Sequence, residues 1–216
     1  MAARQCPSIS DDWEDPQGVV IDAIIFGGRR ATNVPLVVEA RDWEHGVYLG
    51  ATISSERTAA AEGTLGELRR DPFAMAPFCG YNMADHWSHW LSVGQKLRAS
   101  GGVPRIFQVN WFRKGADGRF LWPGFGENSR VIEWILERVD GQVAADDGPL
   151  GLVPQAGSLN VDGLEVSDAD LAELFAVDRD LWLAEADSTQ EFFDTFEGRV
   201  PLAVSKQLDI LRARLT

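Results

Sequence analysis

Residues 110–130 read Asn-Trp-Phe-Arg-Lys-Gly-Ala-Asp-Gly-Arg-Phe-Leu-Trp-Pro-Gly-Phe-Gly-Glu-Asn-Ser-Arg. This stretch places five aromatic residues among glycines and polar side chains, where a buried strand would show aliphatic residues. Gly118, Pro123, Gly124 and Gly126 break it and let the backbone approach a flat ligand closely. A planar heteroaromatic base needs hydrophobic faces together with an amide or backbone edge that reads its donors and acceptors. The stretch therefore predicts a binding site for such a ring.

Strands and helices are expected to alternate on both sides of this stretch. Apolar runs predict strands at 19–26, 35–40, 46–53 and 104–110, with a turn at 42–45 between the second and the third. Helical spacing predicts helices at about 83–98 and from about 128 to 139, and again at 171–175, 181–193 and 204–215. The part at about 17–130 is thus strand-rich and the part at about 155–216 is helical. We expect an α/β fold in which mixed β-sheets are followed by an acidic helical C-terminus.

The charge of the chain is unevenly distributed. The 216 residues carry a net charge of −13, but residues 1–130 hold 14 Lys and Arg against 15 Asp and Glu, whereas residues 131–216 hold 6 against 18. The part with the ring-binding stretch is therefore nearly neutral, and the acidic surplus lies on the C-terminal helices. We interpret that surplus as a solvated surface, which argues against nucleic acid as a partner.

Composition also bounds the cellular setting. With 45% hydrophobic and 25% charged residues, the chain can bury the core of one ordinary domain. No apolar run approaches the ~20 residues that span a membrane, and no signal peptide follows Met1, so the sequence predicts a cytoplasmic protein without a membrane partner. Cys6 and Cys79 are far apart and lack metal-ligand spacing, which predicts two plain thiols.

Four motifs in one order extend the analysis from residue types to a family. They are Phe26-Gly27-Gly28-Arg29-Arg30, Asp71-Pro72-Phe73-Ala74-Met75, Asn110-Trp111-Phe112-Arg113-Lys114 and Phe120-Leu121-Trp122-Pro123-Gly124-Phe125-Gly126-Glu127-Asn128. Together they resemble GTP-dependent phosphoenolpyruvate carboxykinase, and the resemblance runs from Gln5 to the C-terminus. It covers only the C-terminal part of the family's longer chain, and it implies the nucleotide-binding part of the carboxykinase fold.

The resemblance implies how a nucleotide would be bound. Phe112, Phe120 and Phe125 would clamp the guanine of GTP or GDP between them. The loop that continues through Gly126, Glu127 and Asn128 would contact the edge of the base, and the Asn128 amide would help to distinguish guanine from adenine. Trp122 would support the wall of the site. Arg29 would contact the phosphates, with Arg30 packed behind it.

The resemblance also implies a lid and a substrate contact. A mobile lid would run from Arg57 to Glu67 and close over the active site, and its small residues would permit the movement. Phe78 would lie beside bound phosphoenolpyruvate. The lid residues assigned to the active site are Arg57, Thr58, Ala59, Ala60, Ala61 and Glu62.

The residues alone leave plainer interpretations open. The three phenylalanines could be core residues, as Phe usually is, and the arginine pair could be ion-paired at the surface. By propensity the Ala-rich segment would be one short helix that ends at Gly63. His86 and His89 lie one helical turn apart, a spacing that could bind a metal, but no third ligand stands out and we interpret both as structural.

The activity implied by the family is the reversible conversion of oxaloacetate and GTP to phosphoenolpyruvate, carbon dioxide and GDP, with Mn²⁺ and Mg²⁺ bound by the complete enzyme. The sequence contains no Gly-rich loop that ends in Gly-Lys-Ser/Thr and no Lys/His/Asp set for a metal. In the family these come from the missing N-terminal part, which is the implied partner. We therefore expect no metal ligands in this chain and no complete catalysis by it alone. An autonomous, non-catalytic guanine-nucleotide-binding module and an aromatic-groove sugar or peptide binder are the alternatives.

Overall fold

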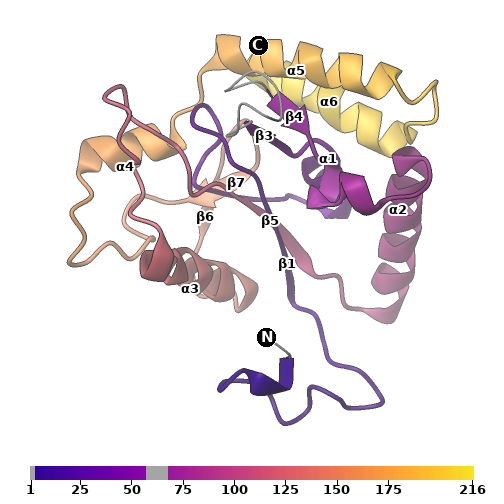
Figure 1. Cartoon of the computed structure of the whole chain (residues 1–216), viewed down its shortest axis with the longest axis horizontal. Coiled ribbons are helices and arrows are strands. Elements are labelled where there is room, and N and C mark those ends of the chain that lie inside the picture. Colours follow the sequence, from indigo (N-terminus) through magenta and orange to yellow (C-terminus); the bar gives the residue numbers. More distant parts are fainter. Residues whose placement is uncertain (1–2, 57–67) are drawn as a thin grey trace.

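The computed structural model of the chain describes residues 3–56 and 68–216 (Figure 1). Its strands are β1 (Ala23–Gly27), β2 (Val37–Glu39), β3 (Ser54–Glu56), β4 (Leu68–Arg70), β5 (Arg105–Val109), β6 (Ala145–Asp147) and β7 (Leu152–Pro154). Its α-helices are α1 (Trp43–Ala51), α2 (Met83–Ser100), α3 (Asn128–Val139), α4 (Asp168–Phe175), α5 (Arg179–Asp194) and α6 (Leu202–Leu215). Short 3-10 turns are η1 (Ala3–Gln5), η3 (Pro72–Ala74), η4 (Ala76–Phe78) and η5 (Phe125–Glu127).

Within the described residues, five strands form a mixed sheet in the order β1-β5-β2-β7-β6. β1 and β5 are parallel neighbours, and Gly27 pairs with Val109 at the end of their register. β2 runs antiparallel to both β5 and β7, and β6 runs antiparallel to β7. β3 and β4 form a separate antiparallel pair. The parallel pair is the important one for function, because the carboxyl ends of β1 and β5 leave the sheet at the same edge.

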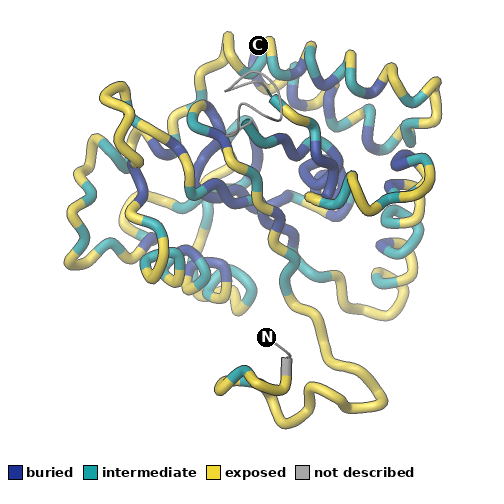
Figure 2. Tube along the Cα trace, in the orientation of Figure 1, coloured by how far each residue is buried: buried dark blue, intermediate teal, exposed yellow. Residues whose placement is uncertain are grey.

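The sheet lies between two groups of helices. Figure 1 shows α3 and α4 on one side, and α1, α2, α5 and α6 on the other. Successive side chains of β5 point to opposite faces of the sheet and so enter both core clusters. Ile106 belongs to the cluster under α1, whereas Phe107 and Val109 belong to the cluster under α3. Val38 and Val37 of β2 divide in the same way. Figure 2 shows the sheet and the inner helix faces as the buried part of the fold, in agreement with the mixed α/β expectation.

The segment 46–53, expected as a strand after a turn at 42–45, is instead mostly helix α1. Every residue of α1 except Glu44 is buried, so the helix shows no polar face and its apolar run resembles that of a buried strand. The helix signal was local: Asp42 is the N-cap, and its carboxylate accepts a hydrogen bond of 2.7 Å from the His45 N–H. Consequently the strand-rich part contains two packed helices, α1 and α2.

The expected strand at 19–26 is shorter and less buried than predicted. β1 begins at Ala23, and the side chains of Val19, Val20 and Ile21 are 59%, 84% and 61% exposed. The reason is the register, because Ala23 pairs with Arg105 at the start of β5, and no strand of the described part of the chain pairs with the residues before Ala23. Figure 2 shows this N-terminal segment running outside the packed body.

The other predicted elements are confirmed, whereas strands β3, β4, β6 and β7, each three residues long, were not predicted. Strands β2 and β5 fall within 35–40 and 104–110, and helix α2 covers 83–98. The amide of Asn82 caps α2, Gly101 ends it with a φ of 88°, and Ser167 and Asp170 form a capping box at α4. In α6 the buried residues are Val204, Leu208, Leu211 and Leu215, as the helical spacing requires. Across the residues that the structure describes, no helix is both long enough and apolar enough to cross a membrane.

His45 of α1 is a buried histidine held in its neutral form. Its side chain is 5% exposed, and its Nδ1 accepts a hydrogen bond of 3.1 Å from the Arg41 N–H. Burial is the main cause that lowers the pKa of His45 to about 3, and the charges of Arg41 and Arg214 add to it. Because the ordinary pKa is about 6.5, folding favours the neutral ring.

This environment predicts a pH dependence of stability. The folded-state pKa of His45 lies below the unfolded value, so its contribution is fully present above about pH 6.5 and is lost as the pH falls toward 3. By pH 5 the loss should reach about 2 kcal/mol of unfolding free energy. Denaturant unfolding of the wild-type chain and of His45→Gln at pH 7.5, 6 and 5 measures this loss of unfolding free energy. Parallel profiles for the two proteins would contradict the assignment.

Candidate functional site

The site is built where β1 and β5 end side by side. Gly28, Arg29 and Arg30 follow β1, and Asn110, Trp111 and Phe112 follow β5. Pairing continues past the strands, since the Gly28 N–H donates to the Val109 carbonyl at 3.4 Å. Two segments that lie 80 residues apart in sequence, counted from Arg30 to Asn110, therefore emerge together.

The side chain of Asn110 joins these two segments. It is 1% exposed; its Oδ1 accepts from the Arg30 N–H at 3.1 Å and from the Phe112 N–H at 3.3 Å. Its Nδ2 donates to the carbonyls of Arg30 at 2.9 Å and of Val34 at 3.0 Å. One buried amide thus satisfies four backbone groups that would otherwise be left without partners in the interior.

Arg29 and Arg30 have different environments. A Cβ on Gly28 would lie 2.6 Å from the Ser54 carbonyl oxygen, so only glycine lets β3 pass this closely. The backbone of Arg29 is then held by β3: its N–H donates to Ser55 Oγ at 3.1 Å, and its carbonyl accepts from the Glu56 N–H at 2.8 Å. The Arg29 side chain is exposed and, within the described residues, makes no ion pair. It is free to meet an anion.

Arg30 is buried in an ion-pair network. Its Nη2 lies 2.9 Å from Glu185 Oε2, and its Nη1 donates to Ser54 Oγ at 2.6 Å. The other oxygen of Glu185 lies 3.0 Å from Arg70 Nη1, and Arg70 also donates to Ser188 Oγ at 2.9 Å. Glu185 therefore ties the loop after β1 to β4 and to helix α5. Because two guanidinium groups share this carboxylate, removal of Glu185 would deprive Arg70 of this partner and leave Arg30 with the more distant Glu56, 3.9 Å away.

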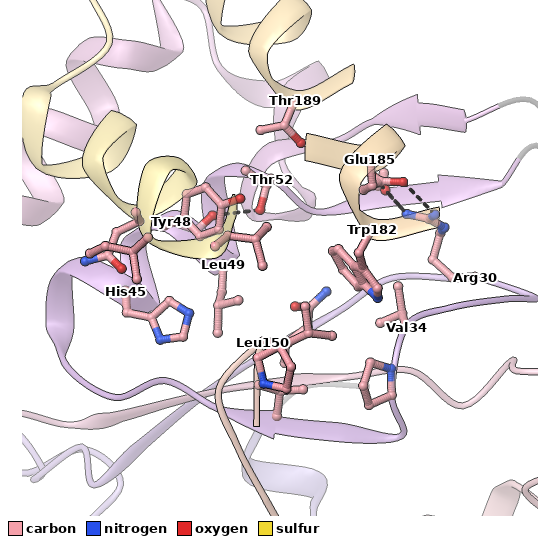
Figure 3. A pocket seen from close by; sticks show the side chains of 18 of the residues that line it. Arg30, Val34, His45, Tyr48, Leu49, Thr52, Leu150, Trp182, Glu185 and Thr189 are labelled. Atoms are coloured by element: carbon pink, nitrogen blue, oxygen red, sulfur yellow. Dashed lines mark hydrogen bonds and ion pairs between the residues drawn. The ribbon is translucent and has the colours of Figure 1, made fainter. Parts of the chain in front are cut away.

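A small cavity lies behind this network, between α1, α5 and the loop before β7 (Figure 3). Arg30 and Glu185 line one end of it, and His45, Tyr48 and Leu150 line the other, as Figure 3 shows. Burial raises the pKa of Tyr48. The cavity volume is about 40 Å³, which has room for water but not for a nucleotide, since ligand pockets need ~300 Å³ or more. The cavity is therefore part of the structure that supports the site and is not the ligand pocket itself.

The chain after Asn110 forms a short hairpin that presents two aromatic rings. The backbones of Lys114 and Phe120 pair as a β-bridge, and the Lys114 N–H donates to the Ala31 carbonyl at 2.8 Å. The rings of Phe112 and Phe120 meet edge to face, with centroids 6.2 Å apart. The two side chains are 37% and 50% exposed, which excludes a core role for them in this chain. Lys114 Nζ lies 5.0 Å from the Phe120 ring centroid.

Phe125 is the most exposed of the three phenylalanines, at 98%. Its φ is 47°, a left-handed conformation that costs energy for a residue with a Cβ, and Gly124 before it has a φ of 76°. A fully exposed ring on a strained backbone gains nothing from packing. No ring contact with Phe112 or Phe120 is formed within the described residues, so the third ring stands apart from the other two.

Trp122 and Asn128 connect the hairpin to helix α3. Trp122 is 1% exposed, and its indole N–H donates to Asn128 Oδ1 at 3.0 Å. Asn128 opens α3, directly after the η5 turn that carries Phe125, Gly126 and Glu127. The Glu127 carboxylate lies 2.5 Å from Arg130 Nε, which leaves its backbone rather than its charge available to a ligand.

Comparison with known proteins gives the family. A model of the protein family described as "Phosphoenolpyruvate carboxykinase C-terminal P-loop domain" matches residues 1–214. The chain belongs to the GTP-dependent phosphoenolpyruvate carboxykinase family. This confirms the resemblance that the motifs carry.

Two carboxykinase relatives show how much of the family's chain is represented. The protein named phosphoenolpyruvate carboxykinase [GTP] of Treponema pallidum (strain Nichols) is 52% identical over 215 residues, which is 99% of this chain and 35% of the relative. The protein of the same name from Thermoplasma volcanium is 50% identical over 209 residues, 97% of this chain and 34% of the relative. The chain thus spans about a third of the length of the curated relatives it matches.

Other residues predicted from the carboxykinase family lie at the margins of this arrangement. Phe78, in η4, is 84% exposed and makes no ring contact with the three phenylalanines among the described residues. The predicted lid, Arg57 to Glu67, lies outside the described residues. Both ring nitrogens of His86 are engaged, by the Tyr81 hydroxyl at 2.9 Å and by the Trp90 indole N–H at 3.0 Å, and burial lowers its pKa. Cys6 and Cys79 are free thiols.

Sequence reasoning missed two residues that hold this candidate site together. Asn110 lay inside the quoted stretch, and its position at the end of a predicted strand was a usable signal for a buried turn amide. Glu185 gave no signal, because it was one of the many acidic residues that we interpreted as solvated surface. Its side chain is 10% exposed, so that interpretation is wrong for this residue.

We predict that Asn110→Leu destabilises the fold strongly, because it removes the partners of four backbone groups, whose hydrogen bonds are buried in three cases, without a large change in volume. The free energy of unfolding should fall by about 3 kcal/mol or more. The matched control is Asn160→Leu, since Asn160 is exposed and also bonds through its amide; it should cost about 1 kcal/mol or less. Chemical denaturation of both variants decides the matter, and equal losses would refute the role given to Asn110.

Proposed function

We propose that this chain is the guanine-nucleotide-binding, C-terminal portion of an enzyme that converts oxaloacetate and GTP to phosphoenolpyruvate, GDP and carbon dioxide. The name of the relatives supports the reaction, and their length supports the assignment to a portion of a larger enzyme. The observation that carries the nucleotide site is the exposure of Phe112, Phe120 and Phe125, with Phe112 directly after β5 at the sheet edge where Arg29 leaves β1. Family membership and geometry point to the same residues.

The three phenylalanines suit a purine ring. Aromatic faces attract any base by stacking, and rings that stay exposed in the folded chain retain their full apolar surface for such a ligand. The left-handed backbone at Phe125 fits this role, because strained conformations persist where they serve binding rather than packing. Stacking contributes affinity but does not distinguish one base from another. Selectivity for guanine must then come from polar groups on the loop at Gly126, Glu127 and Asn128.

Arg29 suits the phosphates of the same nucleotide. Its guanidinium is exposed and free of ion pairs within the described residues, and its backbone is fixed by β3 and Gly28. A planar cation carried on a fixed backbone can stabilise the charge that develops on a transferring phosphoryl group. Arg30 would keep the loop in place through Glu185. We assign the phosphate contact to Arg29 alone.

The metals of the carboxykinase reaction do not fit the described part of this chain. Among residues 3–56 and 68–216, no group of three or more His, Cys, Asp or Glu side chains is placed to hold a metal ion. We propose that Mn²⁺, Mg²⁺ and the Gly-rich phosphate loop are supplied by the N-terminal portion of the same enzyme, which is also the partner of the exposed Phe78. The lid from Arg57 to Glu67 and a cytoplasmic location remain parts of the proposal.

The guanine clamp predicts a selective loss of affinity. Calorimetry should show that the wild-type chain binds GDP more tightly than ADP. Phe125→Ala should weaken GDP and IDP alike by about tenfold to a hundredfold, because either base loses one stacking face. Trp13→Ala, which removes a half-exposed aromatic ring from the N-terminal segment, is the control and should leave both affinities unchanged. Unchanged GDP binding by Phe125→Ala would exclude the clamp.

The proposed reaction is tested on a joined polypeptide. This chain, fused behind the N-terminal portion of the Treponema relative, should release carbon dioxide from oxaloacetate in a GTP-dependent manner with Mn²⁺, whereas the chain alone should not. In the fusion, Arg29→Ala should lower turnover more than GDP affinity, because its charge matters most at the transferring phosphate. Turnover by the isolated chain, or an Arg29→Ala enzyme with unchanged kcat, would contradict these assignments.

A further inference from the structure

The hydrogen bond between Trp122 and Asn128 has a fixed polarity. The indole Nε1–H can only donate, so the atom of Asn128 that faces it must be the amide oxygen. The N–H···O distance of 3.0 Å is that of a well-formed bond. Trp122 is 1% exposed and packs in the core beneath α3, so the donor cannot turn away. The chemistry of the pair therefore determines which end of the Asn128 amide points outward.

The outward end is the Nδ2 group, which offers only N–H donors. No acceptor within the described residues takes a hydrogen bond from Asn128 Nδ2, and Asn128 is only half-buried. Its neighbours cannot substitute for it: Glu127 is paired with Arg130, and the Ser129 hydroxyl donates to the Gly126 carbonyl at 2.6 Å. In the first turn of α3, Asn128 thus presents a free donor directly after the loop that carries Phe125.

We propose that Trp122 is a positioning residue for base selectivity: it locks the Asn128 amide as a hydrogen-bond donor toward the six-position of the bound purine. Guanine and hypoxanthine carry an accepting oxygen there, whereas adenine carries an amino group that donates. A locked donor pairs with the former and faces an unpaired donor in the latter, which costs more than a missing bond. This inference rests on the proposed guanine site, and it identifies Trp122 as the residue that orients the Asn128 amide toward the base.

The ring of Trp122 also packs in the core, so the test must remove its N–H while an aromatic ring stays in place, and a control must match the lost ring volume. Trp122→Phe keeps an aromatic ring and frees the amide to flip. Trp134→Phe is a matched control, because Trp134 lies on α3 in the same core cluster, is 1% exposed, and has a buried indole nitrogen with no partner among the described residues. Asn128→Asp leaves an acceptor for Trp122 and replaces the outward donor with an acceptor.

Calorimetry on the 216-residue chain with GDP, IDP and ADP gives the result. In the wild-type chain and in Trp134→Phe, GDP and IDP should bind more tightly than ADP. In Trp122→Phe the ratio of GDP to ADP affinity should fall by about fivefold or more, and in Asn128→Asp it should fall further, with ADP binding strengthened. A merely structural effect of Trp122→Phe would weaken all three ligands together and leave the ratio unchanged.

The outcomes separate the two proposals. If the wild-type chain prefers GDP to ADP but Trp122→Phe keeps the same ratio, the guanine site stands and the role of Trp122 is refuted. If IDP behaves like ADP in the wild-type chain, the 2-amino group is read instead of the six-position, and the inference also fails. A wild-type chain without any preference would overturn the guanine site and the inference together. If Trp122→Phe fails to fold, an unchanged ratio in Asn128→Asp refutes the inference, and a narrowed ratio supports it.

Discussion

The buried amide of Asn110 is the interaction on which the site depends. Parallel pairing brings the ends of β1 and β5 to one edge of the sheet, but two irregular segments leave that edge with backbone groups that no strand satisfies. Asn110 satisfies four of them, on both segments, from a position that is 1% exposed. Because buried polar groups without partners are costly, this amide determines the path of Arg29 on one side and of Phe112 on the other.

A second constraint explains why adjacent arginines do different work. Arg30 turns inward and shares Glu185 with Arg70, so the loop after β1, strand β4 and helix α5 are joined by one carboxylate. Buried ion pairs are a poor source of net stability, but they penalise any arrangement that separates the partners. The network therefore specifies position. Arg29, one residue earlier, is left exposed with its backbone held by β3, an arrangement that suits the phosphate contact we propose for it.

The aromatic part of the site shows the same division between support and presentation. Within one short stretch, Leu121 and Trp122 are buried while Phe120 and Phe125 are exposed. The buried pair packs against α3 in one core cluster, and the exposed pair keeps its ring faces accessible. Trp122 has a further role as the hydrogen-bond partner of Asn128, so a core residue orients a polar side chain at the surface. In our proposal, the indole nitrogen of Trp122 thus links the packing that supports the hairpin to the selectivity for the base.

The sequence by itself determined the family and the order of most elements, because these depend on local patterns: the uninterrupted motif from Phe120 to Asn128 and the helical period of α6. It did not determine α1, since a helix buried on every side has no amphipathic period. Only the tertiary structure decided that Asn110 joins two loops and that Glu185 pairs with Arg30, which lies 155 residues away in the sequence. The physical reason is that a hydrogen bond or ion pair is defined by distance in space, and the chain must be folded before residues so far apart in sequence can meet.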